Sequence, residues 1–125
     1  GVGREVVVLS VQSVGNGETD TLFDAVQPGY DFEIVEVQSF VEGVAATASL
    51  DLKIGSTSAL DGAHTPTADT REDVSLSTTR ANKQGGETDD LNLHATTDGT
   101  GTLTGAKVKV VIRPRPMAGD PDPVL

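Results

Sequence analysis

The fold class of this chain is decided by the stretch YDFEIVEVQSFV, residues 30–41. Tyr30, Phe32 and Ile34 alternate with acidic residues, which is the pattern of a β-strand with one buried face. After Ile34 the apolar residues move to the other parity and continue to Val41. A β-bulge at this point would restore one buried face, and so would a strand that passes between two sheets. The stretch therefore predicts a long strand.

Further strand-like segments lie on both sides of this stretch. Each has apolar residues at alternate positions or a run of valines, with turn-forming residues near its ends. They are residues 5–14, 19–23, 47–54, 74–78, 91–95 and 106–112. Asp98-Gly99 predicts a β-hairpin between the last two of them. No window longer than about ten residues has the helical period, so we expect helix to be a minor component.

These segments predict an all-β fold. About eight short strands with turns between them are typical of an antiparallel β-sandwich, and a jelly roll and an immunoglobulin-like Greek key both fit. The 125 residues suit one domain, whose core must be aliphatic because there is no Trp, one Tyr and three Phe. We expect residues 1–114 to form the sandwich with a short N-terminal arm. Residues 115–125 are expected to form an extended, proline-rich tail.

The charge of the chain restricts its partners. Nineteen acidic residues against nine Lys and Arg give a formal net charge of −10. A field of that sign repels nucleic acid and anionic membranes and favours cations and basic protein surfaces. No apolar run approaches the length of about 20 residues that spans a bilayer. The absence of cysteine removes disulfides, thiolate metal sites and cysteine nucleophiles.

The two histidines are the first candidates for chemistry. His64 lies in a predicted loop and His94 in a predicted strand, thirty positions apart. Two imidazoles with nearby carboxylates can bind zinc, but no local ligand spacing is present. Counting residues leaves a Ser-His-Asp triad open, although nothing resembles a nucleophile elbow. Ordinary polar roles are the expectation for both.

Two acidic or glycine-rich loops are the remaining candidates. Glu87 and Asp89-Asp90 are oxygen donors of the kind that Ca²⁺ takes, but the Asp-x-Asp-x-Asp-Gly loop is missing. Asp98-Gly99-Thr100-Gly101 has the wrong order for an aspartic protease loop and predicts a tight turn. Gly99, Gly101 and Gly105 precede a strand, whereas a dinucleotide fingerprint opens a helix. We expect no enzyme activity, no metal and no cofactor.

Three motifs carry a resemblance to a known class of proteins. They are PGYDFEI at residues 28–34, KIG at residues 53–55 and GAKVKVVIRP at residues 105–114. In this order, after a valine-rich opening strand, they resemble the small β-sandwich virion proteins of tailed bacteriophages, especially capsid decoration or cement proteins. The resemblance covers about residues 5–114 and is one of overall style, not of a diagnostic motif.

The resemblance implies a structural role on the outer surface of a phage capsid. Such proteins typically form homotrimers at three-fold positions, where they clamp neighbouring copies of the major capsid protein and stabilise the shell. The chain's extended ends would then supply the contacts, with neither nucleic acid nor a membrane as partner. The expected contact residues are Val2, Arg4, Arg113, Arg115, Met117 and Leu125.

A tail-associated or receptor-binding β-sandwich, including a carbohydrate-binding module, is the alternative. Sugar recognition usually relies on exposed aromatic rings, and the chain offers Phe23, Tyr30, Phe32 and Phe40. At least two of these have the pattern of core residues. A hydrolase or metalloenzyme on a jelly roll is the third possibility, and the missing ligand spacing counts against it.

Overall fold

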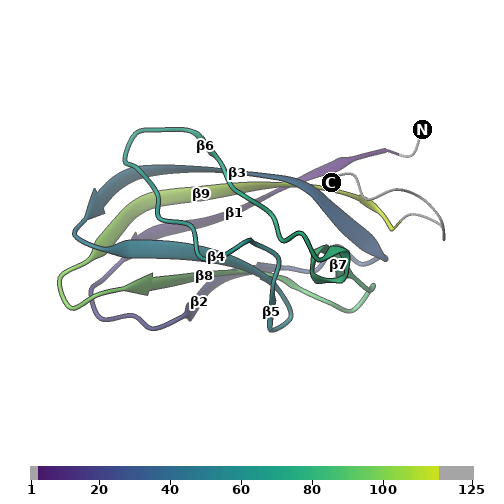
Figure 1. The fold of residues 1–125 in the computed structure, drawn as a ribbon, viewed down its shortest axis with the longest axis horizontal. Coiled ribbons are helices and arrows are strands. Elements are labelled where there is room, and N and C mark those ends of the chain that lie inside the picture. Colours follow the sequence, from purple (N-terminus) through teal and green to yellow (C-terminus); the bar gives the residue numbers. More distant parts are fainter. Residues whose placement is uncertain (1–2, 116–125) are drawn as a thin grey trace.

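A computed structural model describes residues 3–115, which form two antiparallel sheets packed face to face (Figure 1). The larger sheet has the order β1-β9-β3-β6, with β7 also paired to β3, and the smaller has the order β2-β8-β4-β5. The larger sheet consists of β1 (Glu5–Val14), β9 (Thr102–Pro114), β3 (Phe32–Ala45), β6 (Glu72–Asp73) and β7 (Gln84–Gly85). The smaller consists of β2 (Thr21–Val26), β8 (Leu91–Thr97), β4 (Ala48–Ile54) and β5 (Thr57–Ser58). The prediction of an all-β antiparallel sandwich is confirmed.

The connectivity of the two sheets is that of a jelly roll. β1, β2, β3 and β4 alternate between the sheets, and the return path places β8 between β2 and β4 and β9 between β1 and β3. Apart from the two-residue β7, each sheet has four strands, and two such sheets interleaved in this way form the double Greek key of a jelly roll. The only helical element in residues 3–115 is the short 3-10 helix η1 (Arg80–Lys83) before β7.

The change of parity in residues 30–41 is a β-bulge. The pairing of β3 with β9 shifts between Ile34 and Glu36, and on both sides of this shift the apolar residues remain buried. Phe32 and Ile34 lie in the core before it, and Val37 and Val41 after it. β3 therefore stays in one sheet, and the bulge, not a change of sheet, reconciles the two halves of its sequence.

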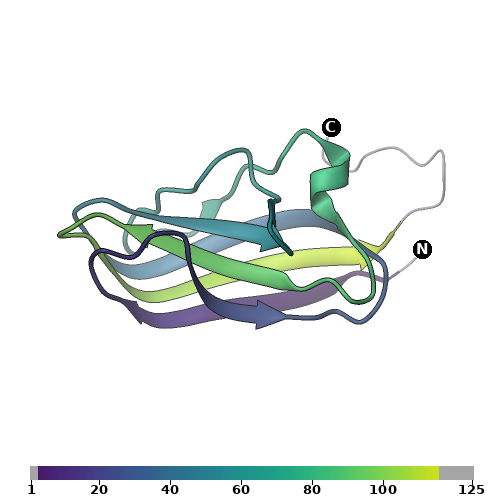
Figure 2. The ribbon, with the colours of Figure 1, turned by 90° about the horizontal axis from the view of Figure 1, so that it is seen from below.

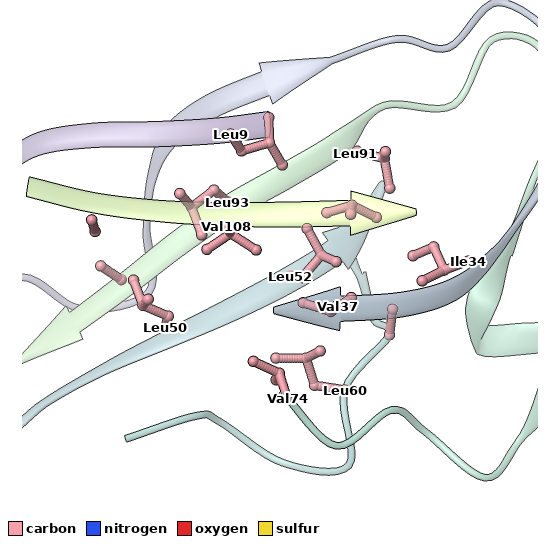
Figure 3. Close-up of a cluster of buried hydrophobic side chains, with 14 of the residues drawn as sticks. Leu9, Ile34, Val37, Leu50, Leu52, Leu60, Val74, Leu91, Leu93 and Val108 are labelled. Carbon is pink, nitrogen blue, oxygen red and sulfur yellow. The ribbon is translucent and has the colours of Figure 1, made fainter. Parts of the chain in front are cut away.

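The core is aliphatic, as the composition predicts. Leu50, Leu52, Leu91 and Leu93 of the smaller sheet pack against Leu9, Ile34, Val37 and Val108 of the larger sheet (Figure 3). Leu60 and Val74 come from the segment between β5 and η1 and extend the same cluster. This segment therefore contributes to the core although little of it is strand.

Two predictions about individual elements were wrong, and a third was correct in type but not in its bounds. Residues 74–78 do not form a strand: Val74 and Leu76 are buried, but the ladder with β3 covers only Glu72–Asp73, and Leu76 makes a single bridge to Leu60. The strand expected at residues 19–23 begins at Thr21 and continues to Val26. Asp98-Gly99 does not close a hairpin, because β8 and β9 belong to different sheets.

The loop between β8 and β9 still turns tightly, and Gly101 is essential to it. Gly101 is buried, and a Cβ at this position would collide with the backbone carbonyl of Thr47, which cannot turn aside as a side chain could. We expect Gly101→Ala to lower the free energy of unfolding by about 2 kcal/mol, a typical cost of overpacking. Urea denaturation of the purified protein measures the change.

Gly99 supplies the matched control in the same loop. A Cβ at Gly99 meets nothing within 4 Å, so Gly99→Ala should change the stability by less than about 0.5 kcal/mol. Equal stabilities for the two variants would show that the loop does not pack against Thr47 as described.

Candidate functional site

His64 lies beside a serine and a glutamate, which are the groups that a hydrolytic triad would need. Its Nε2 atom is 2.9 Å from Ser39 Oγ and 3.5 Å from Glu72 Oε1. In a catalytic triad the two imidazole nitrogens divide these contacts, one facing the nucleophile and the other the carboxylate. Here one nitrogen makes both, and Ser39 is only 2 % exposed. The arrangement fastens the loop that carries His64 to β3 and does not present a nucleophile to solvent.

His94 belongs to a separate polar cluster on the smaller sheet. Its Nδ1 atom is 3.0 Å from the backbone oxygen of Asp20 and 3.3 Å from Asp20 Oδ1. The ammonium group of Lys53 also bonds Asp20, and this hydrogen bond is the main reason why the pKa of Asp20 is lowered. Within residues 3–115, no three His, Asp or Glu side chains converge as metal ligands would. His64 and His94 therefore lie in separate polar contacts, and neither belongs to a cluster of metal ligands within the described residues.

The acidic and glycine-rich loops use their carboxylates to close turns. Asp89 Oδ2 accepts a hydrogen bond of 2.7 Å from the backbone N–H of Gly86, and Asp90 Oδ1 lies 3.4 Å from Gln27 Nε2. Asp98 Oδ1 accepts a hydrogen bond of 2.9 Å from the N–H of Thr100. This bond is the largest of the influences that lower the pKa of Asp98. Asp89, Asp90 and Asp98 thus each have a local structural partner.

The expected contact residues fall into two groups. Val2, Met117 and Leu125 lie outside the described residues. Arg4, Arg113 and Arg115 come together at one end of the larger sheet, because β1 and β9 are antiparallel with Glu5 opposite Ile112. Figure 1 shows the start of β1 and the end of β9 at the same end of the sandwich. Both ends of the described chain therefore leave the sandwich on the same side.

Arg113 differs from the other two because it holds a buried carboxylate. Glu33 is fully buried, and its Oε1 accepts a hydrogen bond of 3.0 Å from Arg113 Nη2. Arg80 Nε lies 2.6 Å and Gln84 Nε2 3.1 Å from Glu33 Oε2. Burial alone would raise the pKa of Glu33, but the two arginines outweigh it and hold the pKa below its ordinary value. We call Glu33, Arg80, Gln84 and Arg113 the Glu33 cluster.

The Glu33 cluster attaches one segment to the outside of the larger sheet. Glu33 and Arg113 are cross-strand neighbours on β3 and β9, whereas Arg80 belongs to η1 and Gln84 to β7. Arg4 and Arg115 remain exposed, and the backbone N–H of Arg115 donates a hydrogen bond of 2.9 Å to the carbonyl of Asp31. Of the three arginines expected as contact residues, Arg4 and Arg115 are therefore accessible to a partner.

A groove on the outer face of the larger sheet is the strongest candidate for a binding site. Its volume is about 230 Å³, and it crosses β1, β9 and β3. The register aligns Val8, Lys109 and Gln38 in one row and Ser10, Lys107 and Phe40 in the next. Arg71 reaches the groove from the loop before β6. The residues that we call the outer groove are Val8, Gln38, Phe40, Arg71, Lys107 and Lys109.

The outer groove collects unpaired positive charge in an acidic protein. Arg71, Lys107 and Lys109 make no ion pair with any residue in the part of the chain that the structure describes. They lie beside Val8, which is 54 % exposed, and close to Val6, which is 56 % exposed. Cations and apolar side chains together suit a partner surface that offers carboxylates and apolar groups.

The sequence indicates part of this groove but not the whole. The alternation in residues 106–112 places Lys107 and Lys109 opposite the core positions, and the structure agrees. Arg71 gives no signal, because its position beside the sheet depends on how the segment between β5 and η1 folds back over β3. No spacing rule joins a loop arginine to two strand lysines more than thirty residues away.

Comparison of the chain with protein-family models, with curated proteins and with solved structures found no match. A search of the described residues for a helix long and apolar enough to cross a membrane found none.

Proposed function

We propose that this chain is a structural protein that binds the outer surface of a phage capsid and clamps neighbouring capsid subunits, with three copies around each site. The outer groove is the observation that carries this proposal. It offers unpaired cations and the exposed Val8 on the outer face of a sheet, in a chain whose formal net charge is −10. Such a surface suits a protein partner with acidic and apolar groups better than a small substrate.

Two further features support the same role. The described chain begins and ends on one side of the sandwich, where Arg4 and Arg115 are exposed, so contacts from both ends can act in one direction. The jelly roll also occurs in viral capsid proteins, although lectins and cupins share it and a fold alone does not specify function. Weak contacts from each of three copies would reinforce one another through their high effective concentration.

Reconstitution tests the proposal directly. Expanded capsids of the encoding phage, prepared without this chain, are mixed with the purified protein, and the bound copies and the temperature of shell disruption are measured. We expect saturable binding and a higher disruption temperature, because a ligand that binds only the intact shell stabilises it. Absence of binding, or binding without a rise in the disruption temperature, would contradict the clamping role.

Neutralising the outer groove should weaken this binding. We expect Lys107→Gln with Lys109→Gln to raise the dissociation constant for the capsid about tenfold or more, because both lysines lose a charge that steers and holds an acidic partner. Added salt should weaken capsid binding by the wild type, and this salt dependence should be smaller for the double variant.

A charge-matched variant is the control for this prediction. Ser56→Glu with Thr57→Glu changes exposed residues at the other sheet. Either pair changes the formal net charge from −10 to −12, by removal of two positive charges or addition of two negative ones. Equal loss of affinity in the two variants would attribute the effect to net charge and remove the outer groove as the contact.

A receptor- or carbohydrate-binding module is the second candidate, and one residue favours it. Phe40 lines the outer groove, where a ring can stack on a sugar. The other aromatic residues are occupied, because Phe32 is fully buried and Phe23 and Tyr30 pack against the core. Specific, saturable binding on a glycan array, lost in Phe40→Ala, would support this candidate over capsid binding.

A further inference from the structure

The outer edge of β1 is the longest strand edge in the described residues that pairs with no other strand, and only Asp24 of β2 bonds its backbone, at Ser10. β1 lies at the margin of the larger sheet and has ten residues (Figure 2). At the opposite margin β6 and β7 have two residues each, and the margins of the smaller sheet are β5 with two residues and β2 with six. Natural proteins usually protect a long edge with lysine, proline or a bulge. The sequence of β1, EVVVLSVQSV, contains no lysine or proline, and its register with β9 is unbroken.

One hydrogen bond shows which backbone groups of β1 point away from the sheet. The N–H of Ser10 donates to Asp24 Oδ2 at 2.9 Å and therefore does not face β9. In an antiparallel pair, the N–H and C=O of one residue point to the same side, and alternate residues share that side. Val6 and Val8 thus direct their backbone groups outward. Neither of them pairs with any strand other than β9 among residues 3–115.

The same two residues are the most exposed large hydrophobic residues in the described part of the chain. Val6 is 56 % exposed and Val8 is 54 % exposed, and the only other large hydrophobic residue of this kind in residues 3–115 is Leu22, at 52 %. An open edge beside exposed valines is the combination that another strand covers in β-augmentation.

The sequence of this edge is complementary to itself about Val7. A two-fold axis through Val7 would place Val6 opposite Val8 of a second copy, so that each pair exchanges both of its backbone hydrogen bonds. The valine side chains of each pair would then cover one another on the outer face. Arg4 would lie opposite Ser10 of the second copy, next to the carboxylate of Asp24 that bonds Ser10. Opposite charges would therefore meet at both ends of the paired segment.

We propose that β1 pairs with β1 of a second copy of this chain, antiparallel and centred on Val7, so that the two larger sheets become one continuous sheet. The occupant of this edge is a second copy because the backbone groups, the valines and the charges of Arg4 and Asp24 all match under one symmetry operation. This contact is a property of the isolated protein and does not depend on the proposed function. On a decorated shell it would connect neighbouring three-fold units.

Sedimentation equilibrium of the purified chain over a range of concentrations tests the contact. We expect a monomer–dimer equilibrium, and we expect Val6→Lys to raise its dissociation constant about tenfold or more, because an edge lysine opposes pairing. Val6 does not line the outer groove, so capsid binding through that groove is left intact. Leu22→Lys is the matched control, since it removes a similarly exposed side chain and adds the same charge on β2, outside the proposed pairing of β1 with β1. A wild-type monomer, a wild-type trimer or equal effects of the two variants would overturn the proposal.

A cysteine at the axis tests the register. The chain has no cysteine, so Val7→Cys introduces a single thiol. Val7 would occupy a non-hydrogen-bonded pair with Cα atoms about 4.5 Å apart, which lies within disulfide range. Val11→Cys is the control: Val11 is on the same face of β1, but the two copies of this residue would lie about 26 Å apart. We expect mild oxidation to link Val7→Cys at least tenfold faster than Val11→Cys, and equal rates or no linked dimer would exclude this pairing.

Discussion

Replacing Glu33 by glutamine lowers the free energy of unfolding by about 3 kcal/mol. The carboxylate is fully buried and holds Arg80 and Arg113 together, so its removal leaves two guanidinium groups facing each other at the edge of the core. Loss of one partner of a buried ion pair typically costs about 3–5 kcal/mol. The lower value applies because the arginine side chains are 27 % and 24 % exposed and water stabilises them in part.

The same substitution changes how stability depends on pH. The pKa of Glu33 is lowered from about 4.5 in the folded protein, since the arginine contacts outweigh the effect of burial. A group with a lowered folded pKa contributes stability above its unfolded pKa and loses it as the pH falls through the folded value. The wild type should therefore lose stability below about pH 4.5, and Glu33→Gln should lack this component.

Urea denaturation at pH 7 and at a series of lower pH values measures both effects. Arg71→Met is the control, because Arg71 is exposed and has no ion pair with a described residue, and its stability should stay within about 0.5 kcal/mol of wild type. If Glu33→Gln matched Arg71→Met at every pH, the Glu33 cluster would not contribute to the fold.

Replacing Phe32 by alanine lowers the free energy of unfolding by about 4 kcal/mol. Phe32 is fully buried on the inner face of β3, and its ring fills the space beside Gly85, where even a Cβ would collide with it. Truncation of a buried phenylalanine removes its transfer free energy and leaves a cavity, at a cost of about 3–5 kcal/mol. Urea denaturation again gives the change, with the slope used to check that the transition stays two-state.

Phe40→Ala is the matched control on the same strand. Phe40 lies beyond the bulge and faces the outer groove, where it is only partly buried. The same chemical change should therefore cost about 1 kcal/mol, the value for partial loss of apolar burial. Equal costs at the two positions would contradict the assignment of faces along β3 and the bulge that produces it.

The sequence predicts the faces of the strands better than their partition between sheets. The change of parity after Ile34 is visible in residues 30–41, and a bulge is one of only two ways to accommodate it. Asp98-Gly99 has the chemistry of a tight turn, and the chain does turn there, but the same chemistry serves a crossing from β8 in one sheet to β9 in the other. Which sheet receives the next strand depends on long-range packing that local residues do not encode.

Alternation also fails where a segment is buried without a continuous partner strand. Val74 and Leu76 alternate as a strand would, and both are buried, yet only Glu72–Asp73 form a ladder with β3. Burial sets the alternation, whereas strand formation also requires a neighbouring backbone in register.

The candidate site also combines features that the sequence predicts with features that only the folded structure shows. Glu33 stands on the polar side of its strand and has the pattern of a solvent-exposed residue, but η1 and β7 cover it. Lys107 and Lys109 are correctly predicted to point outward, and only the folded segment that brings Arg71 beside them makes a groove. The sequence predicts that Lys107 and Lys109 are on the surface, whereas only the three-dimensional fold shows that Arg71 lies beside them.

Cryo-electron microscopy of purified virions tests the central claim most directly. The account predicts density at three-fold and quasi-three-fold positions on the outer shell that fits this jelly roll, with the outer groove or the end that carries Arg4 and Arg115 against the capsid subunits. It also predicts hundreds of copies of this chain per particle, which is on the order of the number of capsid subunits that these copies would hold. Virions without such density on the shell, or with only a few copies confined to the tail, would contradict it.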